Sequence, residues 1–138
     1  MSGPGGHNQN IIEQYRANHG KVNFPLPLIL LTTTGAKSGK PRTTPVAYSR
    51  DGDRIVIIAS KGGAPTHPDW YYNILAHPDV TVELGDERFQ AHATPVTDEG
   101  EYERLYTKHA TQMPGFAEYR TKTTRQIPVI ILERIGAE

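Results

Sequence analysis

The sequence predicts an α+β fold that is mainly β, a six-stranded antiparallel β-barrel with helices packed on its outside. Six short apolar or alternating segments are separated by turn residues, and several neighbours are joined by connections short enough for antiparallel pairing. Strands and helices do not alternate regularly, which excludes a parallel βαβ sheet. The strands are expected at residues 27–34, 43–49, 54–60, 80–84, 88–96 and 127–132.

Turn residues define the strand boundaries. Gly35 ends the first strand, and Asp51-Gly52 between two strand-like runs indicates a tight hairpin. The run that follows, RIVIIAS at 54–60, is apolar at nearly every position and should be buried on both faces. Gly85-Asp86 indicates a second hairpin between two alternating segments.

Two or three helices are expected. Residues 8–18 are weakly amphipathic, and a second helix opens at Pro68, a position that proline tolerates, and stops at Pro78. Asp98 followed by Glu101 forms a capping box for the third helix. That helix carries His109 on an apolar stripe, which we interpret as a core or rim residue, and it breaks at 113–115.

Length and composition exclude several function classes. The 138 residues suit one domain, assigned here to 11–138 after a flexible lead at 1–10. Without cysteines there is no disulfide framework, thiolate zinc site or thiol nucleophile, and the balance of 15 basic and 15 acidic residues argues against nucleic acid as a partner. Neither a signal peptide nor a run of ~20 apolar residues is present, so we expect a cytoplasmic protein, with peripheral membrane association left open.

Two loops combine glycines with cations. The first, GAKSGKPR at 35–42, holds two glycines, a serine and three cations between two strands. The second, SKGGAPTHPDW at 60–70, follows a buried strand with a lysine and two glycines and reaches a helix start. Such loops suit phosphate and other anions, although a basic hairpin turn and a glycine bend are the plainer interpretations. Together they suggest an extended ligand with several negative charges.

Polar catalytic groups are sparse. The six histidines form no metal-binding pattern, so no metal site is predicted, and no nucleophilic triad can be assembled. Met113, Phe116 and Tyr119 could line a pocket for a flat ligand or could belong to the core. Anion-binding loops, an aromatic segment and few acid–base groups fit a protein whose cofactor carries the chemistry.

At these same residues the chain resembles the deazaflavin-dependent nitroreductase family of actinobacteria, within the flavin/deazaflavin oxidoreductase superfamily of split β-barrels. The resemblance rests on LLTTTGAKSGKPRTTPVAY, ASKGGAPTHPDWYYN and RQIPVIILE, and it covers roughly residues 24–134. It implies a six-stranded split barrel that binds coenzyme F-420, an 8-hydroxy-5-deazaflavin with a ribityl-phosphate and an oligoglutamate tail.

The resemblance also implies a set of site residues. Cofactor-binding positions would be Lys37, Ser38, Arg42, Thr43, Thr44, Pro45, Val46, Ala47, Ala59, Ser60, Lys61, Gly62, Gly63, Asp69, Trp70, Tyr71 and Asn73. Met113, Phe116 and Tyr119 would border the substrate, and Ser60 and Tyr119 are candidate proton donors.

The implied activity is hydride transfer from reduced F-420 to an electron-poor conjugated acceptor such as a quinone, an unsaturated lactone or a nitroaromatic. Two alternatives stay open at this point. One is an FMN-dependent reductase or oxidase on the same barrel, and the other is a non-catalytic carrier of the deazaflavin. The expected partner is a small-molecule acceptor, and the expected assembly is a monomer or a homodimer.

Overall fold

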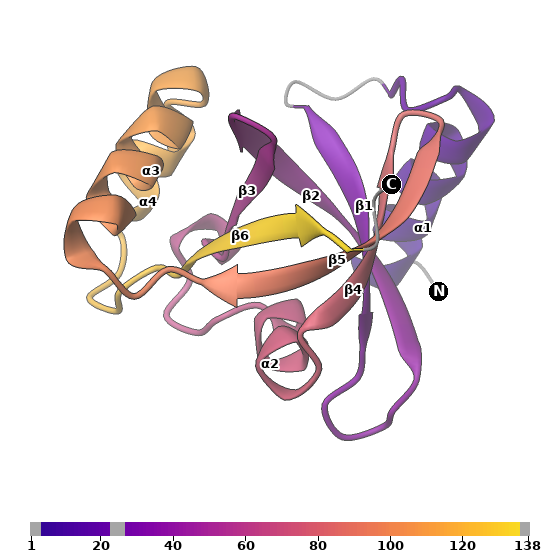
Figure 1. Cartoon of the computed structure of the whole chain (residues 1–138), viewed down its shortest axis with the longest axis horizontal. Helices are drawn as coiled ribbons and strands as arrows, with labels where there is room; N and C mark the ends of the chain where they lie inside the picture. Colours follow the sequence, from indigo (N-terminus) through magenta and orange to yellow (C-terminus); the bar gives the residue numbers. More distant parts are fainter. Residues whose placement is uncertain (1–3, 23–26, 136–138) are drawn as a thin grey trace.

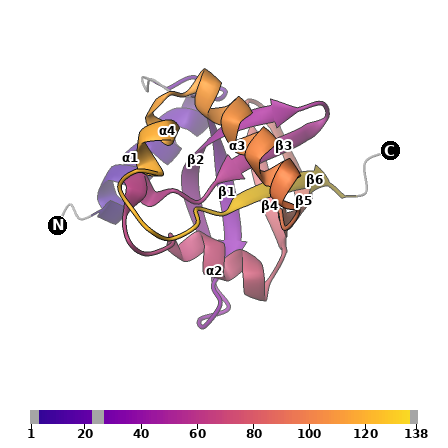
Figure 2. The same cartoon turned by 90° about the vertical axis from the view of Figure 1, so that its left-hand side faces the viewer.

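A six-stranded antiparallel barrel forms the centre of the molecule (Figures 1 and 2). The computed structural model describes residues 4–22 and 27–135. The strands are β1 (Leu28–Thr34), β2 (Pro41–Asp51), β3 (Arg54–Ile58), β4 (Asp79–Leu84), β5 (Glu87–Pro95) and β6 (Val129–Arg134). They close in the order β1-β2-β3-β6-β5-β4, and every pairing is antiparallel. The predicted fold class is confirmed.

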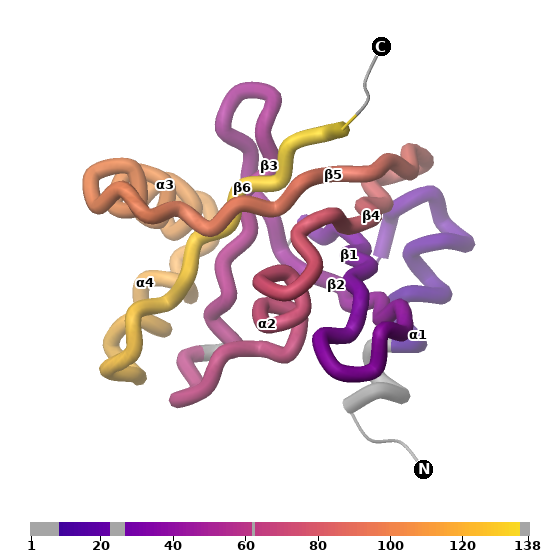
Figure 3. Tube along the Cα trace, turned by 60° about the horizontal axis from the view of Figure 1, so that its bottom comes forward, coloured from indigo at the N-terminus to yellow at the C-terminus, as the bar shows by residue number. Residues whose placement is uncertain are grey.

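Helices surround the barrel on three sides (Figures 1 and 3). They are α1 (Pro4–Ala17), the 3-10 turn η1 (Lys61–Gly63), α2 (Asp69–Ala76), α3 (Glu99–Gln112) and α4 (Gly115–Tyr119). In Figure 1, α3 and α4 lie opposite α1, and α2 lies below the barrel beside the β1–β2 hairpin. Helix α1 begins within the segment expected to be a flexible lead. No helix in the described ranges is long and apolar enough to cross a membrane.

Strand β2 changes partner halfway along its length. Its residues 41–47 pair with β1, whereas Tyr48–Asp51 pair with β3. Over 41–47 the other edge of β2 has no strand beside it among the described residues. Pro45, which has no N–H to donate, lies in this stretch, where an edge position tolerates it. The loops before β2 and after β3 leave the barrel at the same end.

The apolar core has three parts. The barrel interior is filled from all six strands, and Trp70 and Ile74 of α2 pack against this interior cluster. A second cluster fills the space between the barrel and the α3–α4 pair, and a third lies under α1. Strand β3 contributes to both of the larger clusters, with Ile55 and Ile57 in one and Val56 and Ile58 in the other. It is buried on both faces, as its continuous apolar run predicted.

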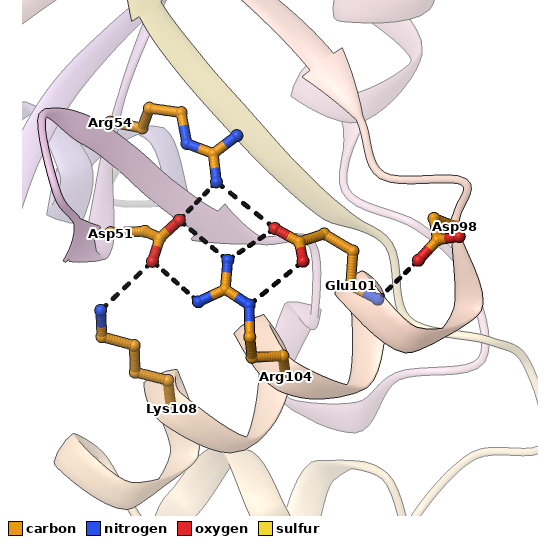
Figure 4. Close-up of polar contacts among 6 residues, drawn as sticks. All are labelled: Asp51, Arg54, Asp98, Glu101, Arg104 and Lys108. Carbon is orange, nitrogen blue, oxygen red and sulfur yellow. Dashed lines mark hydrogen bonds and ion pairs between the residues drawn. The ribbon is translucent and has the colours of Figure 1, made fainter.

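An ion-pair network fastens α3 to the β2–β3 hairpin (Figure 4). Arg104 donates to both carboxylate oxygens of Asp51, at 2.9 and 3.0 Å, and also to Glu101. Arg54 pairs with the same two acids, and Lys108 approaches Asp51 at 3.3 Å. The capping residue Asp98 accepts a hydrogen bond from the Glu101 N–H, as the capping box predicted. These contacts hold the whole α3–α4 unit against the barrel.

Asp51 should stabilise the fold in a pH-dependent way. Hydrogen bonds from Arg104 and Arg54 hold the pKa of Asp51 well below its ordinary value. A carboxyl with a depressed folded-state pKa stabilises the protein above its unfolded-state pKa, and this contribution is lost as the pH falls. We expect Asp51→Asn to lower the free energy of unfolding by about 1–2 kcal/mol at pH 7. The difference from wild type should shrink below about pH 4 in urea denaturation.

The matched control is Asp53→Asn, in the same hairpin turn but without an ion pair in the described structure. It should change stability by less than about 0.5 kcal/mol at either pH. Equal losses for the two variants, or a loss for Asp51→Asn that does not depend on pH, would contradict the role given to the network.

Candidate cofactor-binding site

The loop between β1 and β2 is a tight turn that leaves its cations exposed. The Gly35 N–H donates to the Lys40 carbonyl at 2.8 Å, and the Gly39 N–H donates to the Gly35 carbonyl at 2.9 Å. Gly39 has a φ of 70°, a region that favours glycine. Ser38 Oγ accepts from the Lys40 N–H. With its backbone bonded internally, the turn leaves the side chain of Lys37 exposed to solvent.

Asn73 of α2 ties this first loop to the helix. Its Nδ2 donates to Thr33 Oγ1 at 3.0 Å, and its Oδ1 accepts from the Ala36 N–H at 2.9 Å. The side chain is buried, so both bonds are shielded from water. They hold the loop beside the start of α2.

A pocket of about 600 Å³ lies where the first loop meets α2. Its lining comprises Gly35, Ala36, Lys37, Ser38, Arg42, Asp69, Tyr72 and Asn73. Five of the residues expected at a cofactor site are therefore brought together here, two of them cations. Tyr72 was not among the expected residues, although it follows Tyr71 directly in the sequence.

The second loop places a cation on a strained backbone. Lys61 has a φ of 49°, which non-glycine residues adopt rarely and at a cost of about 1 kcal/mol. Its Nζ donates to Thr66 Oγ1 at 3.1 Å. Gly63 follows with a φ of 82°, packed against the next part of the chain: an added Cβ would lie 2.9 Å from Lys122 Cβ and 3.1 Å from the Tyr119 carbonyl oxygen.

The cations of the two loops have no acidic partner within the described ranges. Lys37, Arg42 and Lys61 form no ion pair there, whereas five arginines elsewhere each pair with a glutamate or aspartate. Unpaired cations beside glycine-rich turns fit a ligand with several negative charges, because such a ligand supplies the missing partners. An anionic cofactor such as a phosphorylated deazaflavin fits this donor set.

The comparisons with known proteins agree with this geometry. The family model described as F-420H(2)-dependent quinone reductase matches residues 8–134. The chain belongs to this family. An F-420H(2)-dependent quinone reductase of Mycobacterium tuberculosis is 41% identical over 126 residues, covering 87% of this chain and 85% of the relative. The resemblance stated from the sequence is confirmed at the level of the family.

Two solved structures share the fold at high identity. An F-420-H2-dependent reductase is 44% identical, with a TM-score of 0.71, covering 78% of this chain and 94% of that one. A structure described as a domain-swapped dimer is 40% identical, with a TM-score of 0.73, covering 92% and 94%.

Several expected cofactor residues have side chains that pack in the core. Val46, Ala59 and Trp70 belong to the barrel-interior cluster and are almost fully buried. Ala47 lies on the outer side of β2, half-buried between α1 and the α3–α4 cluster.

The aromatic segment is mostly core. Met113 and Phe116 are 2% and 6% exposed and pack in the cluster between the barrel and α3. Tyr119 is half-buried, with its ring centroid 5.1 Å from that of Phe116. Of the three residues expected at the substrate, Tyr119 has the most exposed side chain.

His109 is a core residue, as its position on the apolar stripe suggested. Its side chain is fully buried, and burial lowers its pKa to about 4, so the imidazole is neutral at physiological pH. His109 Nδ1 shares a hydrogen bond of 2.7 Å with Ser49 Oγ. Its Nε2 has no partner among the described residues.

The structure adds Arg125 and His67, which the sequence analysis did not assign to the site. Arg125 lies between α4 and β6 and donates hydrogen bonds into the second loop. The sequence offered one indication, since Arg125 opens the RQIPVIILE segment that carries part of the family resemblance. No local sequence pattern predicts which backbone carbonyls accept hydrogen bonds from an arginine that is distant in the sequence.

Gly63 should be essential to the conformation of the second loop. We expect Gly63→Ala to lower the free energy of unfolding by about 2–3 kcal/mol, because it combines a positive φ with a close approach to two neighbouring groups. Gly52→Ala is the matched control, with a φ of 63° and nothing within 4 Å of the added Cβ. It should lose only about 1 kcal/mol, and equal losses in chemical denaturation would contradict the steric argument.

Proposed function

We propose that this protein transfers a hydride from reduced coenzyme F-420 to a quinone or a similar electron-poor acceptor. Family membership supports the cofactor and the acceptor class. The observation that carries the assignment is the set of unpaired cations on the two loops at one end of the barrel. A cofactor with a phosphate and an oligoglutamate tail carries several separate anions that two cationic loops can bind.

In this proposal each of the two loops binds a different part of the cofactor. Lys37, Ser38 and Arg42 would bind the anionic tail in the 600 Å³ pocket, with Asp69 and Asn73 shaping its wall. Lys61 and the backbone of Gly62 and Gly63 would bind the phosphate. The ring would lie along the free edge of β2, beside Thr43, Thr44, Pro45, Val46 and Ala47 and next to Ala59, Ser60, Trp70 and Tyr71.

The protein residues have to orient the reactants and manage one proton. When bound, the reduced cofactor supplies a hydride, and the quinone takes up that hydride and one proton to become a hydroquinone. Ser60, a residue that is 7% exposed just after β3, can hold or deliver a proton with little competition from bulk water. Tyr119 would form the outer wall of the acceptor site, backed by Phe116 and Met113. Holding two reactants in a reactive geometry can lower the barrier by as much as about 7–11 kcal/mol.

A binding titration separates this function from its closest alternative. The protein should bind F-420 at least about tenfold tighter than FMN, equivalent to about 1.4 kcal/mol, because FMN lacks the glutamate tail. Fluorescence titration of both cofactors measures the ratio directly. Equal affinities, or tighter FMN, would overturn the cofactor assignment, and F-420 binding without quinone turnover would indicate a carrier.

Two further variants test the tail site. Lys37→Ala combined with Arg42→Ala should weaken F-420 binding and reduce its dependence on salt, since fewer charges are then paired. Lys40→Ala is the control, because it removes a cation of the same loop that does not line the pocket. It should leave affinity within about twofold.

Tyr119 can be tested for two separate roles. Tyr119→Ala should lower kcat/KM for a water-soluble naphthoquinone by about tenfold or more, because a loosely held acceptor reacts slowly. Tyr119→Phe keeps the ring and should lose less than about threefold, since solvent can protonate the product. A large loss in Tyr119→Phe would instead make the hydroxyl the proton donor. Unchanged turnover in Tyr119→Ala would move the acceptor site elsewhere.

A further inference from the structure

Arg125 donates four hydrogen bonds into the loop that carries Lys61. Its Nη2 donates to the Ser60 carbonyl at 2.7 Å, its Nε to the Ala64 carbonyl at 2.9 Å, and its Nη1 to the Ala59 carbonyl at 3.2 Å. The same Nη1 lies 2.8 Å from His67 Nδ1. The partners span both sides of η1, and about sixty residues of chain separate them from Arg125.

Only an arginine can make this set of contacts. The guanidinium is planar and offers five N–H donors in a fixed fork, so one side chain can reach three carbonyls and a ring nitrogen at once. Arg125 forms no ion pair with the acids of the described structure. Its donors are therefore committed to the loop.

These bonds also fix where the loop's N–H groups point. In a planar trans peptide, the C=O of one residue and the N–H of the next point in opposite directions. Because the carbonyls of Ala59 and Ser60 face Arg125, the N–H groups of Ser60 and Lys61 face away from it. Within the described ranges, neither of these N–H groups donates a hydrogen bond to the protein.

The same bonds restrain the strained residue. The Ser60–Lys61 peptide is held from one side by Arg125, and Lys61 itself has a φ of 49°. On the other side of η1, Gly63 packs against Tyr119 and Lys122, which precede Arg125 on the same connection. A strained conformation persists only where its surroundings determine it, and here the segment 119–125 provides those surroundings.

We propose that Arg125 is a positioning residue for the cofactor phosphate: it orients the Ser60–Lys61 backbone so that two N–H groups and the Lys61 ammonium converge on one anion. This inference rests on the proposed function, which places the phosphate at the second loop. Arg125 acts through the loop and does not itself contact the ligand.

A double-mutant cycle with Lys61 tests this role. Arg125→Met and Lys61→Met should each weaken F-420 binding by about tenfold or more in a fluorescence titration. If Arg125 acts by positioning Lys61 and its N–H groups, the double variant should be little weaker than the worse single variant. A purely structural arginine would give losses that multiply. Arg125→Met should also reduce the salt dependence of binding as much as Lys61→Met does, although it removes no charge that contacts the ligand.

Two controls complete the design. Arg134→Met removes an arginine that pairs with Glu87 on the outside of the barrel and should leave F-420 affinity unchanged. If Arg125→Met fails to fold, as judged by circular dichroism, Arg125→Lys decides the question. Lysine cannot reproduce the fork, so Arg125→Lys should still bind F-420 several-fold more weakly than wild type.

The results of these binding experiments distinguish a failure of the proposed function from a failure of the positioning role of Arg125. Wild-type protein that does not bind F-420 would overturn the proposed function and this inference with it. Wild-type protein that binds F-420, together with an Arg125 variant of unchanged affinity or with multiplying losses in the cycle, would overturn the role of Arg125 alone.

Discussion

The change of partner along β2 is the constraint on which the proposed cofactor site depends. A strand paired on both edges has no free backbone groups, and its neighbours block access from either side. By pairing with β3 only from Tyr48 onward, β2 has no strand on one edge over residues 41–47 within the described structure. The same register brings the loop before β2 and the loop after β3 to one end of the barrel. Both cation-bearing loops, and the free edge between them, therefore follow from a single feature of strand pairing.

Charged side chains have two different roles in this molecule. On the α3 side, acids and bases are matched within a compact network around Asp51, and the helix pair is fastened to the barrel. At the two loops, cations stand without acidic partners and contribute nothing of this kind to folding. A protein with no net charge can thus keep exposed cations at its loops, because several of its acids are paired with other basic residues.

Local patterns in the sequence were sufficient for most of the fold. The β2–β3 hairpin, the fully apolar run of β3 and the Asp98 cap each depend on neighbours only a few residues away, and each was predicted correctly. The two turn residues of that hairpin are Gly52 and Asp53, one position later than the Asp51-Gly52 signal, because Asp51 pairs with Arg54 at the end of β2. The hydrogen-bond partners of Asn73 and Arg125 could not be predicted in the same way. Their partners lie 37 to 66 residues away along the chain. Most of these partners are backbone groups, which cannot be identified from residue type because nearly every residue has them.

The aromatic segment shows why core and pocket are hard to separate from a sequence. Residues such as Met113 and Phe116 suit a buried cluster and a ligand wall equally well, and the structure places both in the cluster.

The packing of Phe116 still links the core cluster to Tyr119 at the proposed acceptor site. Ser49 on β2 bonds His109 on α3, the ring of His109 lies 4.4 Å edge-on from Phe116, and Phe116 in turn contacts Tyr119. Because His109 stays neutral down to about pH 4, this chain of contacts keeps its charge state across the physiological range. The position of Tyr119 relative to the free edge of β2 is therefore set by buried packing, which is how a site that works by positioning gains its rigidity.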